Sequence, residues 1–320
     1  MAAFQAKADG RAIKRINYRQ RKRNLFFACI VALPIIQFSI CYIYVNLNSF
    51  ILAFQHYEYA EEGLGFKITF AKFENFVEGI GLIGERLFMF KQSLILFFWQ
   101  TIVGLTLALL FAYYIYKKYP MRELFRVILF VPKIMSGVVF CLLFKYIAND
   151  VYVYIAENVF HAENVIGLLD NMDTKLGTVI FFSVWVSFGI DVLMFSGAMS
   201  GIDESVVESA HLDGVNTVQE FIFITVPSIW PTFISFFTIH LAALFTNQMH
   251  LHTLFGTQAG ELSTLGYYLY VNSAKSELIT TDNTPSFSVL SAIGLMMTAI
   301  MLPLTISVRK ALRKFGPSVD

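Results

Sequence analysis

The sequence predicts an all-α polytopic membrane protein with six transmembrane helices and a polar cytoplasmic elbow between the fourth and fifth spans. Three observations predict this fold. Of the 320 residues, 56% are hydrophobic and only 15% are charged, against about 25% charged residues in typical soluble proteins. Six stretches are apolar over about 20 residues, the length that crosses a bilayer. Basic residues concentrate in every second connection between these stretches.

The six predicted spans cover residues 25–45, 93–116, 124–147, 177–200, 228–247 and 286–308. They form one domain, 25–308, between basic tails at 1–24 and 309–320. The loop 46–92 is long for a connection, and its apolar spacing after residue 70 predicts a short amphipathic helix on the outer surface. Pro132 and Pro303 fall inside predicted spans, where proline usually kinks a helix.

The distribution of lysine and arginine orients the spans. The first tail holds eight of them, the loop between spans two and three holds four, and the C-terminal tail holds four, which makes sixteen of 24. The intervening loops are acidic, with Glu61 and Glu62 among their carboxylates. By the positive-inside rule, both termini and the elbow are cytoplasmic. The basic first tail is expected to contact anionic membrane lipid.

Composition argues against several other kinds of function. A net charge of +1 gives no basic field for nucleic acid. The cysteines Cys29, Cys41 and Cys141 lie in apolar stretches and are expected to be buried thiols, with no metal site. The chain has no Gly-Lys pair, which a phosphate-binding P-loop requires. We therefore expect no catalytic site and no cofactor bound by this chain.

The elbow, residues 201–227, is predicted to form two short helices joined by a turn. Asp203 can cap a helix over 204–212, and Gly214 follows where a left-handed residue ends it. Asn216 or Thr217 can cap the second helix, and Thr217 with Glu220 has capping-box spacing. Helices this short need a partner surface. That surface is either the cytoplasmic end of the same bundle or a groove on another protein.

The elbow resembles the Glu-Ala-Ala loop of ABC-importer permeases. The resemblance rests on the Glu-Ser-Ala triplet, the glycine four residues after it, and the Ile-x-Val-Pro exit, with Ser209 in place of the usual alanine and Val226 in place of leucine. An aspartate directly before this glycine, here Asp213, resembles the carbohydrate branch of the family, which contains the maltose-like and glycerol-phosphate-like permeases. The segment STLGYYLYVNSA also resembles the outer segment before the last span of that branch.

This resemblance implies that the elbow is a coupling helix. It would sit in a cleft of an ATPase through Glu208, Ser209, Ala210, Leu212, Asp213, Gly214, Ile224 and Pro227. Glu208 would either hold the elbow together or bond across that interface. The implied partners are two ABC ATPase subunits, which bind ATP and Mg²⁺, a second homologous permease chain forming a heterodimer, and an extracytoplasmic binding protein. The implied location is a bacterial-type cytoplasmic membrane, and the implied cargo is a carbohydrate.

Polar residues inside spans are costly and usually functional. Lys133 and Asp191 both lie roughly 13 Å deep, at 1.5 Å rise per residue. Their opposite charges predict an ion pair or a shared hydrogen-bond network. His240, Asn247, Gln248 and Trp185 add groups suited to a sugar. These six residues form the candidate substrate path, although each one singly is more often a packing residue.

Two alternatives stay open from the residues. One is an ABC-importer permease for a peptide, an amino acid or an anion. The other is a six-span channel or membrane enzyme without an ATPase. That second alternative predicts intramembrane catalytic residues or a repeated pore motif, and the sequence contains neither.

Overall fold

The computed structural model describes the backbone of residues 2–59, 66–275 and 285–317, and their side chains except those of 2–19, 58, 59 and 66. The basic side chains before Gln20 and the acidic residues Glu61 and Glu62 lie outside this part. Within it, six helices are long and apolar enough to cross a membrane: Gln20–Leu52, Phe88–Tyr116, Gly137–Asn158, Met172–Met199, Thr217–Ala242 and Phe287–Phe315. The predicted all-α, six-span fold class is confirmed.

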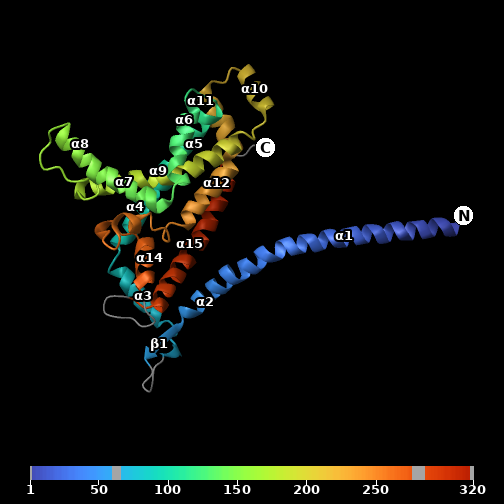
Figure 1. The fold of residues 1–320 in the computed structure, drawn as a ribbon, viewed down its shortest axis with the longest axis horizontal. Helices are drawn as coiled ribbons and strands as arrows, with labels where there is room; N and C mark the ends of the chain where they lie inside the picture. The colour runs from blue at the N-terminus through green and yellow to red at the C-terminus, as the bar shows by residue number, and fades with distance from the viewer. Residues whose placement is uncertain (1, 60–65, 276–284, 318–320) are drawn as a thin grey trace.

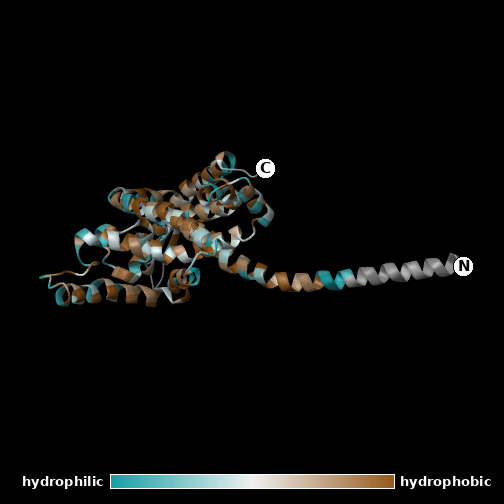
Figure 2. Cartoon of the chain, turned by 90° about the horizontal axis from the view of Figure 1, so that it is seen from above, coloured by the Kyte–Doolittle hydropathy of each residue, from teal (hydrophilic) through white to brown (hydrophobic). Residues whose placement is uncertain are grey.

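The first span leaves the bundle as one long helix (Figure 1). It consists of α1 (Ala2–Phe38), a π-helical turn (Ser39–Tyr44) and α2 (Val45–Leu52). Every side chain from Gln20 to Ile51 is exposed, and its apolar stretch is visible in brown in Figure 2. Cys29 and Cys41 are therefore exposed, contrary to expectation, while Cys141 is buried. An apolar helix of this kind requires lipid or another chain around it.

The outer loop folds into a hairpin followed by the predicted amphipathic helix. Strand β1 (Gln55–Tyr59) pairs antiparallel with β2 (Phe66–Phe70), and α3 (Glu74–Gly84) packs on the last span. The buried Asn75 amide donates to the carbonyls of Ala53, at 2.9 Å, and Gln55, at 2.8 Å. These two bonds fix the hairpin to the start of α3.

The third predicted span, 124–147, is broken, which corrects the sequence prediction. Helix α6 (Arg122–Ile134) ends two residues after Pro132. Met135 is extended, with ψ of 155°, and a new helix starts at Gly137. That helix is α7 (Gly137–Tyr146), continued by a π-helical turn and α8 (Tyr152–Asn158). Proline removes a backbone donor and crowds the preceding turn, so the apolar run divides into two helices.

Span two and span four form the centre of the bundle. Span two consists of α4 (Phe88–Phe97), a π-helical turn (Phe98–Val103) and α5 (Gly104–Tyr116). Helix α9 (Met172–Met199) is span four, and it packs along α5. On its other side α9 approaches α6 at Gly189, where an added Cβ would lie 2.4 Å from the Leu129 carbonyl oxygen. Only glycine permits this approach.

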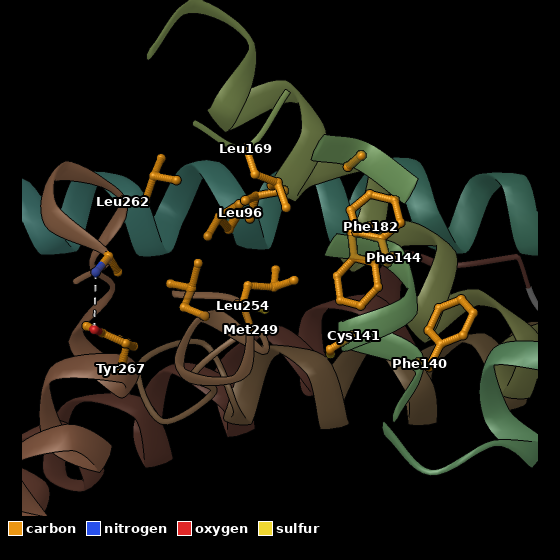
Figure 3. Packing of buried hydrophobic residues seen from close by; sticks show 14 of the residues in the cluster. Leu96, Phe140, Cys141, Phe144, Leu169, Phe182, Met249, Leu254, Leu262 and Tyr267 are labelled. Carbon is orange, nitrogen blue, oxygen red and sulfur yellow. Dashed lines mark hydrogen bonds between the residues drawn. The ribbon is translucent and has the colours of Figure 1, made fainter. Parts of the chain in front are cut away.

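Two apolar clusters surround α9. One joins it to α4, α7 and the segments 249–271, through residues that include Leu96, Phe182 and Leu254 (Figure 3). The other joins it to α5 and span five through Ala112, Phe195 and Ile229. Both ends of α9 are therefore fixed, and its polar residues have defined neighbours.

The second helix of the elbow continues into the fifth span without a break. Helix α10 (Glu204–Leu212) is followed by α11 (Thr217–Glu220), a π-helical turn (Phe221–Thr225) and α12 (Val226–Ala242). The helix is therefore under way ten residues before Pro227, which does not mark its entry. It also ends earlier than expected, so His240 lies near its end and Asn247 and Gln248 lie beyond it.

The last part of the chain returns across the bundle. Helices α13 (Leu251–Phe255) and α14 (Leu265–Lys275) precede α15 (Phe287–Phe315), which runs unbroken through Pro303. The Trp230 indole donates to the Leu312 carbonyl at 3.0 Å and joins α12 to the end of α15. The end of α15 lies at the same end of the bundle as α10 and α11, opposite the β1–β2 hairpin (Figure 1).

Candidate functional site

The first helix of the elbow starts at the helix cap and is ended by the left-handed glycine that the sequence predicts. Asp203 caps α10, its Oδ1 accepting from the Ser205 amide at 2.9 Å and hydroxyl at 2.8 Å. These two bonds, the amide's first, lower the pKa of Asp203. Gly214 has φ of +79°. The Val215 amide donates to Ala210 and the Gly214 amide to His211, both at 3.1 Å, the Schellman arrangement of a helix end.

The second helix of the elbow is capped one residue earlier than Thr217. Asn216 accepts from the amides of Val218, at 3.1 Å, and Gln219, at 2.9 Å. The Gln219 side chain accepts from the Asn216 amide at 3.0 Å, which completes a capping box. The Thr217–Glu220 box is therefore wrong. Asn216 provides the cap, and Glu220 turns inward instead.

The residues expected to couple the elbow to a partner divide by exposure. Ala210 is buried against its own chain, and Ile224 and Pro227 are half-buried. The other five, Glu208, Ser209, Leu212, Asp213 and Gly214, are exposed. Leu212 is 89% exposed. Among the described residues no hydrogen bond or ion pair is found for the Glu208 side chain, and the Ser209 hydroxyl donates to the Ser205 carbonyl at 2.8 Å.

A buried carboxylate that the sequence did not single out fixes the elbow to the bundle. Glu220 is 1% exposed. Lys117, at the end of α5, places its Nζ 2.6 Å and 2.7 Å from the two carboxylate oxygens. The His211 Nε2 on α10 lies 2.9 Å from Oε2. Nothing in its local pattern separates Glu220 from an exposed helical glutamate, because Lys117 lies 103 residues away in the chain.

Most residues of the candidate substrate path lie around a cavity of about 290 Å³. It brings together four residues of the candidate path, Lys133, Asp191, His240 and Asn247. It also adds Gln100, Ser183, Ser187 and His250, which the sequence analysis missed. Ser183 and Ser187 precede Asp191 by eight and four residues, the spacing of one helix face, and could have been found by that spacing.

The charges in the cavity pair differently from the prediction. Within 4.0 Å of the Asp191 carboxyl, the only basic side chain among the described residues is His240, whose Nε2 lies 3.9 Å from Oδ2. Lys133 faces the same cavity but forms no ion pair within that distance in the described chain. Asp191 Oδ2, His240 Nδ1 and Ser183 Oγ are buried without a hydrogen-bond partner among the described residues. Buried polar atoms are normally paired, so this cavity suits a polar ligand.

Trp185 and Gln248 lie apart from the cavity. Trp185 packs on Phe140 and Phe181, with ring centroids 5.1 Å and 5.8 Å away. Gln248 has a buried Oε1 without a hydrogen-bond partner in the described chain, but it does not line this space. No group of three or more His, Cys, Asp or Glu that could hold a metal ion occurs among the described residues.

A known protein family matches the segment of this chain that carries the elbow and nearly all of the cavity. Residues 101–320 match the family described as binding-protein-dependent transport system inner membrane component. AraP of Bacillus subtilis, an arabinooligosaccharides transport system permease protein, is 27% identical over 150 residues, which cover 45% of this chain and 47% of AraP. The chain therefore matches about half the length of that relative. LacF of Rhizobium radiobacter, a lactose transport system permease protein, is 26% identical over 87% of this chain and 90% of its own.

The fold has a solved counterpart. A chain in the crystal structure of a bacterial ABC transporter, involved in the import of the acidic polysaccharide alginate, has a TM-score of 0.70 at 18% identity. The alignment covers 93% of this chain and 99% of that one. Because the family match covers more than half of the sequence, including the elbow and nearly all of the cavity, the resemblance to importer permeases is confirmed. This multi-pass membrane protein belongs to the family of inner membrane components of binding-protein-dependent transport systems.

Proposed function

We propose that this chain is the transmembrane permease subunit of an ATP-driven ABC importer and forms half of the translocation path for a carbohydrate. The observation that carries the proposal is the rigid corner with an exposed apolar end. Leu212 is 89% exposed and Val218 65% exposed, while the helices behind them are capped and fixed by Glu220. Apolar side chains on an anchored helix fit a groove of another protein.

The proposed partners are two ATPase subunits and a second permease chain. Two ATPase subunits would bind the ATP and Mg²⁺, one under this elbow and one under the elbow of a second, homologous permease chain. The exposed first span supports such a second chain, a heterodimer by analogy with the carbohydrate branch, because none of the 18-residue apolar core of that span is buried. ATP can drive the change only if it binds one global state better than the other.

In the proposed orientation, both termini would lie in the cytoplasm of a bacterial cell. The end of α15 lies beside the elbow (Figure 1), and the basic residues of both tails favour that side. The hairpin and the acidic loops then face outward, where an extracytoplasmic binding protein would deliver the cargo. A periplasmic protein carrying an alginate pentasaccharide is part of one solved relative, and several relatives bear sugar names.

The first test is capture of the ATPase. Replacing Leu212 with glutamate adds a charge to the exposed apex without disturbing a bond inside this chain. We expect the unmodified chain, purified in mild detergent from its native membrane, to bring with it a P-loop ATPase and a second permease. The L212E chain should lose at least nine-tenths of the ATPase and keep the second permease, as measured by mass spectrometry.

The matched control is Phe160→Glu, at a side chain that is 75% exposed in the loop between spans three and four. That variant should keep both partners. Equal loss from both variants, or an unmodified chain that arrives intact and alone, would contradict the proposed docking.

A second test uses the left-handed corner. Gly214→Val forces a β-branched residue to φ of +79°, which costs roughly 1–2 kcal/mol or more. No atom lies within 4 Å of an added Cβ at Gly214, so the strain is in the backbone and the bundle is undisturbed. We expect normal amounts in the membrane but at least tenfold less ATP-driven uptake. Gly197→Val, at an equally open but helical position, should keep most uptake, and a similar loss there would remove the argument.

A further inference from the structure

Glu220 is the most buried charged side chain in the described part of the chain, at 1% exposed. Removing a carboxylate from water costs several kcal/mol unless charges and hydrogen bonds replace the solvent. Lys117 does this with short contacts to both oxygens, and His211 adds a third contact. Glu220 does not line the cavity. The desolvation cost of its buried charge is high for a residue that serves packing alone.

The three residues come from three different elements. His211 belongs to α10, the exposed helix of the elbow, and Glu220 ends α11. Lys117 directly follows α5, the inner half of span two. The carboxylate therefore links α10 both to the start of the fifth span and to the end of the second. In Figure 1, α10 stands at the rim of the molecule, with α11 between it and the bundle.

A second contact strengthens the link to α5. The Tyr113 hydroxyl donates to the Thr217 carbonyl at 3.1 Å, and its ring lies 4.9 Å from that of Phe221. Lys117 Nζ lies 5.9 Å from the centre of the same Tyr113 ring. The elbow is thus joined to span two by one ion pair, one hydrogen bond and one aromatic contact.

Span two leads directly to the cavity. Helix α5 packs along α9 through Leu105, Ala108 and Ala112 on one side and Phe188, Val192 and Phe195 on the other. Asp191 lies on α9 between these contacts and lines the cavity. A displacement of the end of α5 therefore reaches the cavity through close-packed side chains, which transmit shifts instead of absorbing them.

We propose that Glu220, Lys117 and His211 are positioning residues that make α10, span two and span five move as one body. The inference rests on the proposed function, because an ATPase has to move α10. With the carboxylate in place, a shift of α10 displaces α5 by the same amount. Without it, α10 moves with span five alone, and the wall of the cavity formed by α9 is displaced less.

The test measures the distance between α10 and α5 in the assembled transporter with its ATPase. Glu204→Cys on α10 and Leu110→Cys on α5, in a chain whose three native cysteines are replaced by alanine, carry spin labels at exposed positions. With Glu220 present, we expect this distance to be unchanged between the nucleotide-free state and the ATP-bound state. In Glu220→Gln it should shift on ATP binding by about 2 Å or more, the scale of helix shifts in switching proteins.

Further variants separate positioning from folding. Glu220→Gln leaves Lys117 near a neutral amide, and if that chain does not assemble, the double variant K117M/E220Q removes both charges and should show the same ATP-dependent shift. Lys117→Arg keeps the ion pair and should restore the fixed distance. The same fixed distance in E220Q and in K117M/E220Q would overturn the inference.

The proposed function fails in a different way. A third label pair, Glu204→Cys with Phe160→Cys in the outer loop, measures α10 against the far side of the molecule. The absence of an ATPase complex, or of any ATP-dependent shift in this pair, would contradict the importer itself. A shift in this pair together with an unchanged α10–α5 distance in every variant would contradict only the role of Glu220.

Discussion

Gly189→Leu is expected to remove nearly all properly folded protein from the membrane. An added Cβ would lie 2.4 Å from the Leu129 carbonyl oxygen and 3.4 Å from its carbon. Both atoms belong to the backbone of α6 and cannot rotate away. Overpacking of this kind typically costs about 1–3 kcal/mol, occasionally more, and the remaining leucine atoms add to the clash. The measurement is the monodisperse fraction after detergent extraction, by fluorescence-detected size exclusion.

Gly197→Leu is the matched control, because it changes the same residue type in the same helix. No atom lies within 4 Å of its added Cβ, and the position is exposed. This chain should extract like the unmodified one. Gly189→Ala should give an intermediate loss. If Gly189→Leu is extracted as well as Gly197→Leu, the close approach of α6 and α9 does not exist in the membrane.

Asp191→Asn is expected to reduce uptake at least tenfold while the assembled complex is retained. The substitution keeps the shape of the side chain but removes the charge 3.9 Å from His240. Asp191 Oδ2 has no hydrogen-bond partner among the described residues and can accept from a sugar hydroxyl. A hydrogen bond to a charged group contributes about 1.5–3 kcal/mol, and 1.4 kcal/mol corresponds to a factor of ten. The measurement is initial uptake of a radiolabelled sugar that the unmodified transporter imports, with arabinooligosaccharides and lactose tried first because relatives carry those names.

Ser187→Ala provides the comparison for Asp191. It lies one turn away on the same helix and lines the same cavity, but its hydroxyl already donates to the Val184 carbonyl at 3.0 Å. Its removal should change uptake less than about threefold, because the bond that this hydroxyl donates lies within α9 and does not reach the cargo. Normal uptake by Asp191→Asn would take this cavity out of the translocation path.

Local rules predicted those parts of the protein that depend on neighbours in the sequence. The cap at Asp203 and the left-handed Gly214 were predictable because each depends on hydrogen bonds between residues at most five positions apart. The number of spans was predictable because lipid requires a fixed length of apolar helix. Lys133 and Asp191 were expected at one depth, and both line one cavity.

Features that depend on distant contacts could not be predicted. Two local choices were also open: Pro132 predicted a kink but not the full break at Met135, and either Asn216 or Thr217 could cap the second helix. Glu220 was assigned to a capping box, whereas Lys117, 103 residues earlier, draws it inward. The direct Lys133–Asp191 pair depended on helix rotation, which side-chain packing sets and hydropathy does not.

Because Thr217–Ala242 is one unbroken helix, a tilt at its elbow end displaces its other end. Its 26 residues measure about 39 Å at 1.5 Å per residue. A tilt of about 10° at the elbow would therefore carry the far end through roughly 7 Å, more than one helical turn. His240, two residues from that end, would travel nearly the whole distance. A tilt of a few degrees at the elbow is thus enough to change the distance between His240 on the fifth span and Asp191 on the fourth.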